Sequence, residues 1–317
     1  GIAAHHAGVL LFSALLGLLL RFWDVTLNVP SAVPLLLLVG ATTISLGGIT
    51  LRGSPHVAWR DLLPVRRSTL RYGLVPVVLA VGVLVVHAGD DSALRYGLAF
   101  ALIFAGPTAI TALTISRSSG GIVRPSIYML LLSTLISAAV IPGILTLYGY
   151  AAGSMHVIAY LGLSTLTLLA PLLLVIILRD LYPIATARFS ERNASTAVLL
   201  LASFVVLAFQ HIDISTFMPA GLIAIAAGVA MRVTAVMLAR HRRLYAIDDY
   251  VSMSYPNIFL IILLAEVLGD PQIKAVATWY LLPMFALVAI DELFHKHLLR
   301  QQHKPHLKAF LGIHDSA

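Results

Sequence analysis

The chain alternates between long apolar segments and short polar ones. Crossing the hydrocarbon core of a bilayer as a helix takes about 20 residues. Segments that approach or exceed this length lie near residues 7–22, 31–50, 72–88, 92–116, 122–148, 155–178, 195–211, 215–238, 248–268 and 272–294. We therefore predict an all-α polytopic membrane protein with ten transmembrane helices.

The polar segments between these helices alternate in the sign of their charge. Seventeen of the 21 Lys and Arg residues fall in every second loop or in the C-terminal tail. They are Arg52, Arg60, Arg66, Arg67, Arg71, Arg117, Arg124, Arg179, Arg188, Arg192, Arg240, Arg242, Arg243, Lys296, Arg300, Lys304 and Lys308. The other loops are short and hold Asp24, Asp90, Asp91, Asp213 and Asp270. Because basic loops stay in the cytoplasm, we expect both termini inside, in the inner membrane of a prokaryote.

Composition narrows the function class. Hydrophobic residues make up 59% of the chain and charged residues 11%, against roughly 25% charge in soluble domains. The net charge of +7 belongs to the inside loops, so we expect a lipid bilayer as partner and no nucleic acid. The chain has no cysteine, no glycine-rich nucleotide loop with its lysine and no spacing typical of a nucleophile and base. These features predict a protein that is neither an enzyme nor an ATP-driven pump, without cofactor or metal centre.

The predicted helices divide into two sets of five. An odd number per half makes the second half enter from the opposite face, which is the condition for an inverted repeat. We expect a first repeat over residues 1–150, an inverted second repeat over 151–296 and a cytoplasmic tail over 297–317. Prolines recur at comparable places in the two halves. The pairs are Pro76 with Pro219, Pro107 with Pro256, and Pro142 with Pro283.

The fourth helix of each half carries a predicted break beside polar groups. Proline lacks an N–H and clashes with the preceding turn, so Gly106-Pro107 and Pro256 should interrupt their helices. Freed backbone groups cannot face lipid and must face protein or a watery cavity. There, half-helix N-termini attract anions and freed carbonyls hold cations. The candidate binding residues are Thr108, Thr111 and Ser126 from the first half and Ser252, Ser254 and Asn257 from the second.

Few ionisable residues lie inside the predicted helices. Arg232 lies in the inner half of the eighth, where it either reaches the interface by snorkelling or acts in the site. Asp248 and Asp249 open the ninth and either gate ions or favour the positive helix end. No carboxylate lies clearly at mid-membrane, which argues against a dedicated proton pump.

Three segments carry a resemblance to a known family. The first is Ile44–Leu51 followed by Pro64, the second runs from Gly120-Gly121 through Ser126 to Ser133–Ser137 and Pro142, and the third is Pro256-Asn257. In these segments the chain resembles the bile acid:sodium symporter family. The resemblance implies a panel domain and a core domain, fourth and ninth helices that cross at their breaks, alternating access and an organic anion substrate.

The chain departs from that family at the sodium ligands. The counterparts here are Ala112, Leu113 and Ser252, and Leu130 replaces a hydroxyl. The coupling ion, Na⁺ or H⁺, is therefore left open, as is the oligomeric state. Auxin efflux carrier-like proteins and cation/proton antiporters share the architecture, and a non-transporting receptor or channel is the alternative from another class. The interpretation favoured by the sequence is a secondary active transporter of a small organic anion.

Overall fold

The computed structural model is all-helical over the residues that it describes, which are 6–30, 32–47, 68–109, 112, 123–150, 154–239 and 251–302. Within helices, side chains are not described for residues 6, 123–128, 154–157, 191, 194, 239 and 291–302. The helices are α1 (His6–Phe22), α2 (Ala32–Gly47), η3 (Thr69–Leu74), α4 (Val75–Val86), α5 (Asp91–Ala105), α7 (Val123–Leu147), α8 (Ser154–Ser164), η4 (Thr165–Leu169), α9 (Ala170–Leu181), α10 (Pro183–Gln210), η5 (Ile214–Thr216), η6 (Phe217–Gly221), α11 (Leu222–Ala239), α13 (Ile258–Leu268) and α14 (Pro271–Gln302).

Five helical stretches of the described chain are long and apolar enough to cross a membrane. They are Thr69–Val86, Met129–Leu147, Ile158–Leu181, Ile214–Leu238 and Pro271–Ile290. The 52° bend within α10 adds a sixth if its two parts count as one span. Helices α1 and α2 are apolar but, at 17 and 16 residues, reach only about 25 Å at 1.5 Å per residue. The chain is thus a multi-span helical membrane protein, and the count of ten stays a prediction.

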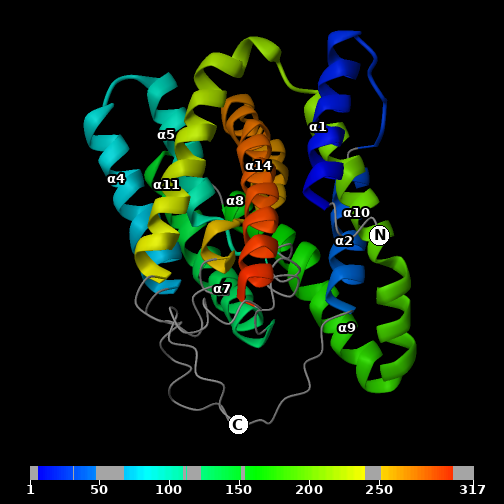
Figure 1. Ribbon diagram of the computed structural model, residues 1–317. Helices are drawn as coiled ribbons and strands as arrows, with labels where there is room; N and C mark the ends of the chain where they lie inside the picture. The colour runs from blue at the N-terminus through cyan, green and yellow to red at the C-terminus, as the bar shows by residue number, and fades with distance from the viewer. Residues whose placement is uncertain are drawn as a thin grey trace.

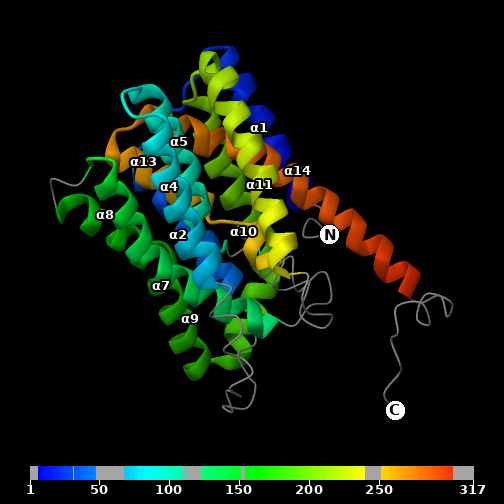
Figure 2. The ribbon, with the colours of Figure 1, turned by 90° about the vertical axis from the view of Figure 1, so that its left-hand side faces the viewer.

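Helices far apart in the sequence form two groups (Figures 1 and 2). In Figure 1, α1, α2, α9 and α10 stand together on one side, and we call these four helices the wall. The other side contains α4, α5 and α11, with α14 packed against α5, α11 and α13. Small residues bring the wall helices close: Gly17 of α1 lies against the backbone of Val206 in α10, with no room for a side chain. Such contacts typically drive helix packing in lipid.

The core of the second group is α13 and the end of α5. Every residue of α13 from Ile258 to Ala265 is buried, as is every residue of α5 from Ala101 to Ala105. A helix that is apolar all round is buried by its neighbours rather than by one face. Helix α13 and the end of α5, which adjoin the predicted breaks, are therefore enclosed by protein on all sides.

Three helices widen to π-helical geometry next to a proline. Segment η3 precedes Pro76, η4 precedes Pro171 and η6 contains Pro219. Proline cannot donate the usual helical hydrogen bond, so the local register shifts; the N–H of Val75, for example, donates to Leu70, five residues back. Short π-helical stretches are frequent at functional sites.

The connections that carry acidic residues lie at one end of the helices. Figure 1 shows the α1–α2, α4–α5 and α10–α11 connections at the same end, and they contain Asp24, Asp90 and Asp213 respectively. Asp90 caps α5 by accepting from the N–H of Ala93 at 3.0 Å. This arrangement agrees with the alternation of charge along the sequence.

The turn between α13 and α14 holds a buried carboxylate. Helix α13 ends at Gly269 in the left-handed conformation (φ 65°), which brings Asp270 to the start of α14. Asp270 is 2% exposed and accepts from the N–H groups of Gln272 and Ile273 at 2.9 Å. It also pairs with Arg95 at 3.0 Å and accepts from the Tyr150 hydroxyl. One carboxylate thus joins α5, α14 and the end of α7.

We predict that Asp270→Ala lowers the free energy of unfolding by about 2 kcal/mol, since it removes a helix cap and a buried hydrogen bond. The measurement is the melting temperature in detergent, followed by tryptophan fluorescence. Asp213→Ala is the matched control, because Asp213 also caps a turn, at Ser215, but is exposed. Equal losses in the two variants would contradict the structural role given to Asp270.

Candidate functional site

The chain leaves helical geometry at two places that lie against each other. Helix α5 ends at Ala105, immediately before Gly106-Pro107, and residues 251–254 are helical before the chain extends through Tyr255–Asn257. Thr108 and Pro256 form an antiparallel bridge. Its two hydrogen bonds run from the N–H of Ala109 to Tyr255 at 2.8 Å and from the N–H of Asn257 to Pro107 at 2.6 Å. We call this bridged region the crossing.

Side chains satisfy two of the carbonyls that α5 leaves free at the crossing. In a continuous helix the carbonyl of Phe104 would accept from Thr108, but that N–H donates to Ser133 Oγ at 2.9 Å. Arg71 Nη1 donates to the Phe104 carbonyl instead. The carbonyl of Ala105 accepts from Ser137 Oγ at 2.5 Å. Helix α7, which carries both serines, is thus bonded to the crossing.

The second break is satisfied by the same region of the first half. Pro256 has no N–H, so the carbonyl of Ser252 four residues earlier lacks its helical donor. It accepts instead from the Tyr72 hydroxyl at 2.7 Å and from Thr108 Oγ1 at 3.1 Å. The N–H of Asn257 would be the helical donor to the Met253 carbonyl, but it donates to Pro107 in the bridge. The Met253 carbonyl therefore accepts from Arg71 Nε at 3.3 Å. A buried carbonyl without a donor costs about 1–3 kcal/mol.

Arg71 corrects the interpretation of the charge pattern. Counted among the basic residues of a cytoplasmic loop, it lies instead in η3 and is fully buried at the crossing. The apolar run was predicted to begin at residue 72, whereas the helical stretch begins at Thr69, one turn earlier. Arg232, expected inside the eighth helix, donates to the Tyr255 hydroxyl at 3.0 Å and is half-buried.

Two buried hydroxyls beside the crossing have no hydrogen-bond partner among the described residues. They are Ser252 Oγ and Ser254 Oγ, on residues that are 0% and 4% exposed. Buried hydroxyls nearly always find a partner in a folded protein. An unpaired pair next to a helix break is what a site for a polar ligand or water molecules would leave.

A narrow cleft separates the crossing from the wall. Its lining comes from α2, from Leu201 of α10 and from the crossing itself, where Ala109, Asn257 and Phe259 contribute. On α2 the lining residues are Leu38, Ala41, Thr42 and Ser45. The cleft has a volume of about 20 Å³, which holds about one water molecule. This conformation is therefore closed to anything larger.

The structure brings four of the six predicted binding residues to the crossing: Thr108, Ser252, Ser254 and Asn257. Asn257 caps α13 by accepting from the N–H of Leu260 at 3.4 Å, and it lines the cleft. Ser126 lies in α7, where its side chain is not described, and Thr111 lies outside the described residues. Asp248 and Asp249 also lie outside them.

Sequence reasoning missed Arg71, Tyr72, Ser133 and Ser137. The two serines are four residues apart and so share one face of α7, which is a signal that the spacing offered. Arg71 and Tyr72 stand five and four residues before Pro76, within the turn that proline distorts. Two polar residues four and five positions before a proline in an apolar segment indicate a polar site inside the helix rather than the end of a loop.

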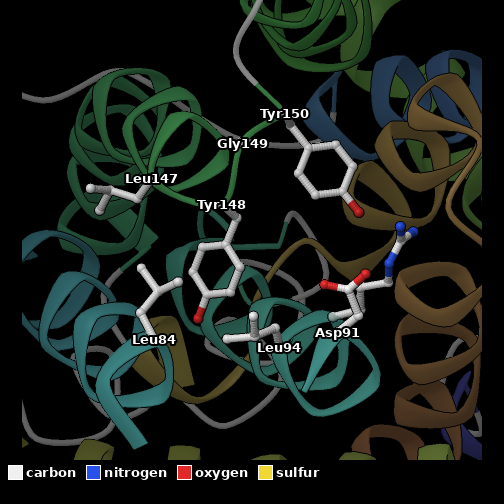
Figure 3. Close-up of a pocket in the computed structure, with 8 residues that line it drawn as sticks. Leu84, Asp91, Leu94, Leu147, Tyr148, Gly149 and Tyr150 are labelled. Atoms are coloured by element: carbon white, nitrogen blue, oxygen red, sulfur yellow. The ribbon is translucent and has the colours of Figure 1, made fainter. Parts of the chain in front are cut away.

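A larger cavity of about 340 Å³ lies at the end of the helices that carries the acidic connections (Figure 3). Figure 3 shows Tyr148, Tyr150 and Asp91 among the residues that line it, and the Tyr150 hydroxyl donates to Asp270. Burial raises the pKa of Tyr148 to about 12. Burial, reinforced by the hydrogen bond to the Asp270 carboxylate, raises the pKa of Tyr150. Both hydroxyls therefore stay protonated at neutral pH.

No protein-family model matches the chain, and no curated protein matches its sequence. The fold and the crossing define the class of protein, a multi-span helical membrane protein with two helix breaks bonded to each other.

We predict that Tyr72→Phe lowers the free energy of unfolding by about 1–2 kcal/mol, because it removes one donor to the Ser252 carbonyl at a fully buried position. Melting temperature in detergent measures the loss. Tyr148→Phe is the matched control: its hydroxyl also donates to a backbone carbonyl, that of Ala80 at 3.0 Å, but at a half-buried position that water can reach. If Tyr148→Phe lowers the melting temperature as much as Tyr72→Phe or more, the hydrogen bond from Tyr72 has no greater effect on stability than an accessible one, and the prediction is wrong.

Proposed function

We propose that this protein is a secondary active transporter that moves a small organic anion by alternating access, with its site between the crossing and the wall. The observation that carries the proposal is the antiparallel bridge between two helix breaks beside a cleft lined by both parts. Discontinuous helices that meet near the middle of the molecule are the form that many transporters give to a binding site.

Matching features in the two halves support an inverted repeat. The third and eighth predicted helices each combine a proline with a π-helical segment. Pro76 follows η3, and Pro219 lies within η6. The fourth and ninth are interrupted at Pro107 and Pro256. The fifth and tenth each contain a proline within a continuous helix, Pro142 and Pro283. Three shared irregularities in the same order favour two related halves of opposite orientation.

The grouping of helices supports two bodies that move against each other. The wall consists of α1, α2, α9 and α10, from the first, second, sixth and seventh predicted helices. We propose it as the counterpart of the panel domain that the resemblance to bile acid:sodium symporters implies. The cleft lies between this wall and the crossing. Because the cleft now holds about one water molecule, binding an organic molecule requires the wall to move away.

The chemistry of the cleft favours an anion. Asn257 is both a cleft residue and the N-cap of α13, so the positive end of that helix faces the cleft. Its amide and the unpaired hydroxyls of Ser252 and Ser254 supply donors nearby. No described residue places a carboxylate on the cleft. Thr111 and Ser126 remain predicted binding residues. Na⁺ and H⁺ remain the candidate coupling ions.

The competing function is a channel or a receptor that transports nothing. Thermal-shift screening of taurocholate, indole-3-acetate and succinate, with and without Na⁺, identifies a ligand through its stabilisation of the folded state. Counterflow of the stabilising anion in proteoliposomes supports the carrier, whereas single-channel currents support the channel.

Substitution of Asn257 tests the site. We expect Asn257→Ser, which keeps a capping oxygen but removes the amide, to reduce uptake of the identified anion about tenfold, since one lost hydrogen bond of about 1.4 kcal/mol gives that factor. Asn257→Ala should lose more, because the cap goes too. Asn193→Ala is the control at a residue on the exposed side of α10. Wild-type uptake in both Asn257 variants would remove this residue from the site.

A single cysteine tests whether the cleft opens. The chain contains no cysteine, so Ser45→Cys places one thiol on the α2 side of the cleft. We expect the anionic reagent methanethiosulfonate ethylsulfonate to block uptake by this variant, and the transported anion to slow the labelling. Ser215→Cys, at an exposed position, should be labelled at the same rate with or without the anion. Labelling of Ser45→Cys that the anion does not slow argues against a substrate path through the cleft.

A further inference from the structure

The guanidinium of Arg71 lies between the two interrupted helices. Its nitrogens contact the carbonyl of Phe104 at the end of α5, the carbonyl of Met253 before the second break and the sulfur of Met231 in α11. The rings of Tyr72 and Phe104 lie 4.8 and 5.0 Å from its central carbon. The residue is fully buried, and each of its three nitrogens has a protein partner.

No carboxylate of the described chain forms an ion pair with this buried charge. Moving an isolated charge out of water costs several kcal/mol even after the protein relaxes, so the charge needs compensation. The contacts supply it. The Phe104 carbonyl lies in the last turn of α5, and a helix C-terminus carries about half a negative elementary charge. The Met253 carbonyl, in helical residues 251–254 before the second break, adds a second partial negative charge beside the single positive charge of Arg71.

The same oxygens are those that a coupling cation would use. Where transporter helices are interrupted, freed carbonyls at the C-terminal ends of the half-helices coordinate the coupling ion, Na⁺ or H⁺. Here the Phe104 and Met253 carbonyls are freed because their helical donors, the N–H groups of Thr108 and Asn257, bind elsewhere. Arg71 holds both of them.

We propose that Arg71 is a tethered cation that occupies the cation position of the crossing, so that the crossing needs no free Na⁺ there. A guanidinium stays protonated at every physiological pH, so the position is filled permanently. This inference rests on the proposed transport function. It implies that the anion is transported without coupling to Na⁺ at the crossing.

The contacts of Arg71 separate this role from that of a substrate ligand. A ligand-binding arginine needs its paired donors directed at the ligand, whereas Arg71 spends all three nitrogens on protein atoms and is absent from the lining of the cleft. Arg232 offers the natural comparison. It also lies near the crossing, but its described contacts are the Tyr255 hydroxyl and, at 3.4 Å, the carbonyl of Leu287 within the continuous helix α14.

The test measures the melting temperature of the purified full chain while NaCl replaces N-methyl-D-glucamine chloride at constant ionic strength. We expect the wild-type melting temperature to move by less than about 1 °C. Arg71→Ala should melt lower and regain about 3 °C or more, saturably, with Na⁺ or methylguanidinium, because either cation fills the vacated position. Arg232→Ala, the matched control, should show neither cation response.

Saturable stabilisation of the wild type by Na⁺ overturns the proposal, and so does an Arg71→Ala variant that responds to neither cation. If Arg71→Ala yields no folded protein, the wild-type titration and the conservative variant Arg71→Lys decide: Arg71→Lys should fold and stay insensitive to Na⁺, and a Na⁺ response in either protein counts against the tethered cation. Since no step measures transport, failure here is distinct from failure of the proposed function, which the uptake experiments address.

Discussion

The structure depends on satisfying backbone carbonyls where two helices stop in the buried interior. Proline and glycine end the helices at Gly106-Pro107 and at Pro256, and lipid offers no donors to the groups set free. Backbone bonds across the crossing satisfy part of the demand. Arg71, Tyr72 and Ser137 donate to further carbonyls, and Ser133 accepts from the freed N–H of Thr108. Four segments distant in sequence are thereby held at one point.

Much of the helical layout could be predicted from the sequence, because a run of apolar residues long enough for a bilayer has few alternatives to a helix. Each of the ten predicted segments contains helix among its described residues, although only five or six satisfy the length and composition of a span. The contact between the breaks could not be predicted from the residues alone, since the pairing of Thr108 with Pro256 depends on tertiary packing. It was expected only through the resemblance to bile acid:sodium symporters.

The missed residues show where charge patterning fails. A basic residue at the edge of an apolar run is ordinarily a loop residue, and on that basis Arg71 was assigned to the cytoplasm. The π-helical turn of η3 instead carries both Arg71 and Tyr72 into the crossing. Asp270 lies in the loop where it was predicted, but it is buried there as a cap and an ion-pair partner. Hydrogen-bonding demand outweighs the preference of a charged group for water in both cases, from distant helix ends at Arg71 and from the adjacent start of α14 at Asp270.

The anchoring of the second break to η3 constrains how the molecule can bend. Because Arg71 and Tyr72 hold carbonyls of both interrupted helices, η3 and α4 must travel with α5 and residues 251–254 in any large motion. The chain passes between this body and the wall after α2, after α7 and after α10. After α7, Gly149 adopts a positive φ of 78°. At the end of α10, the side chain of Gln210 bonds to both backbone groups of Leu27, at 3.4 and 3.1 Å. These bonds tie the end of α10 to the α1–α2 connection, so the passage after α10 starts from a point that is fixed on the wall.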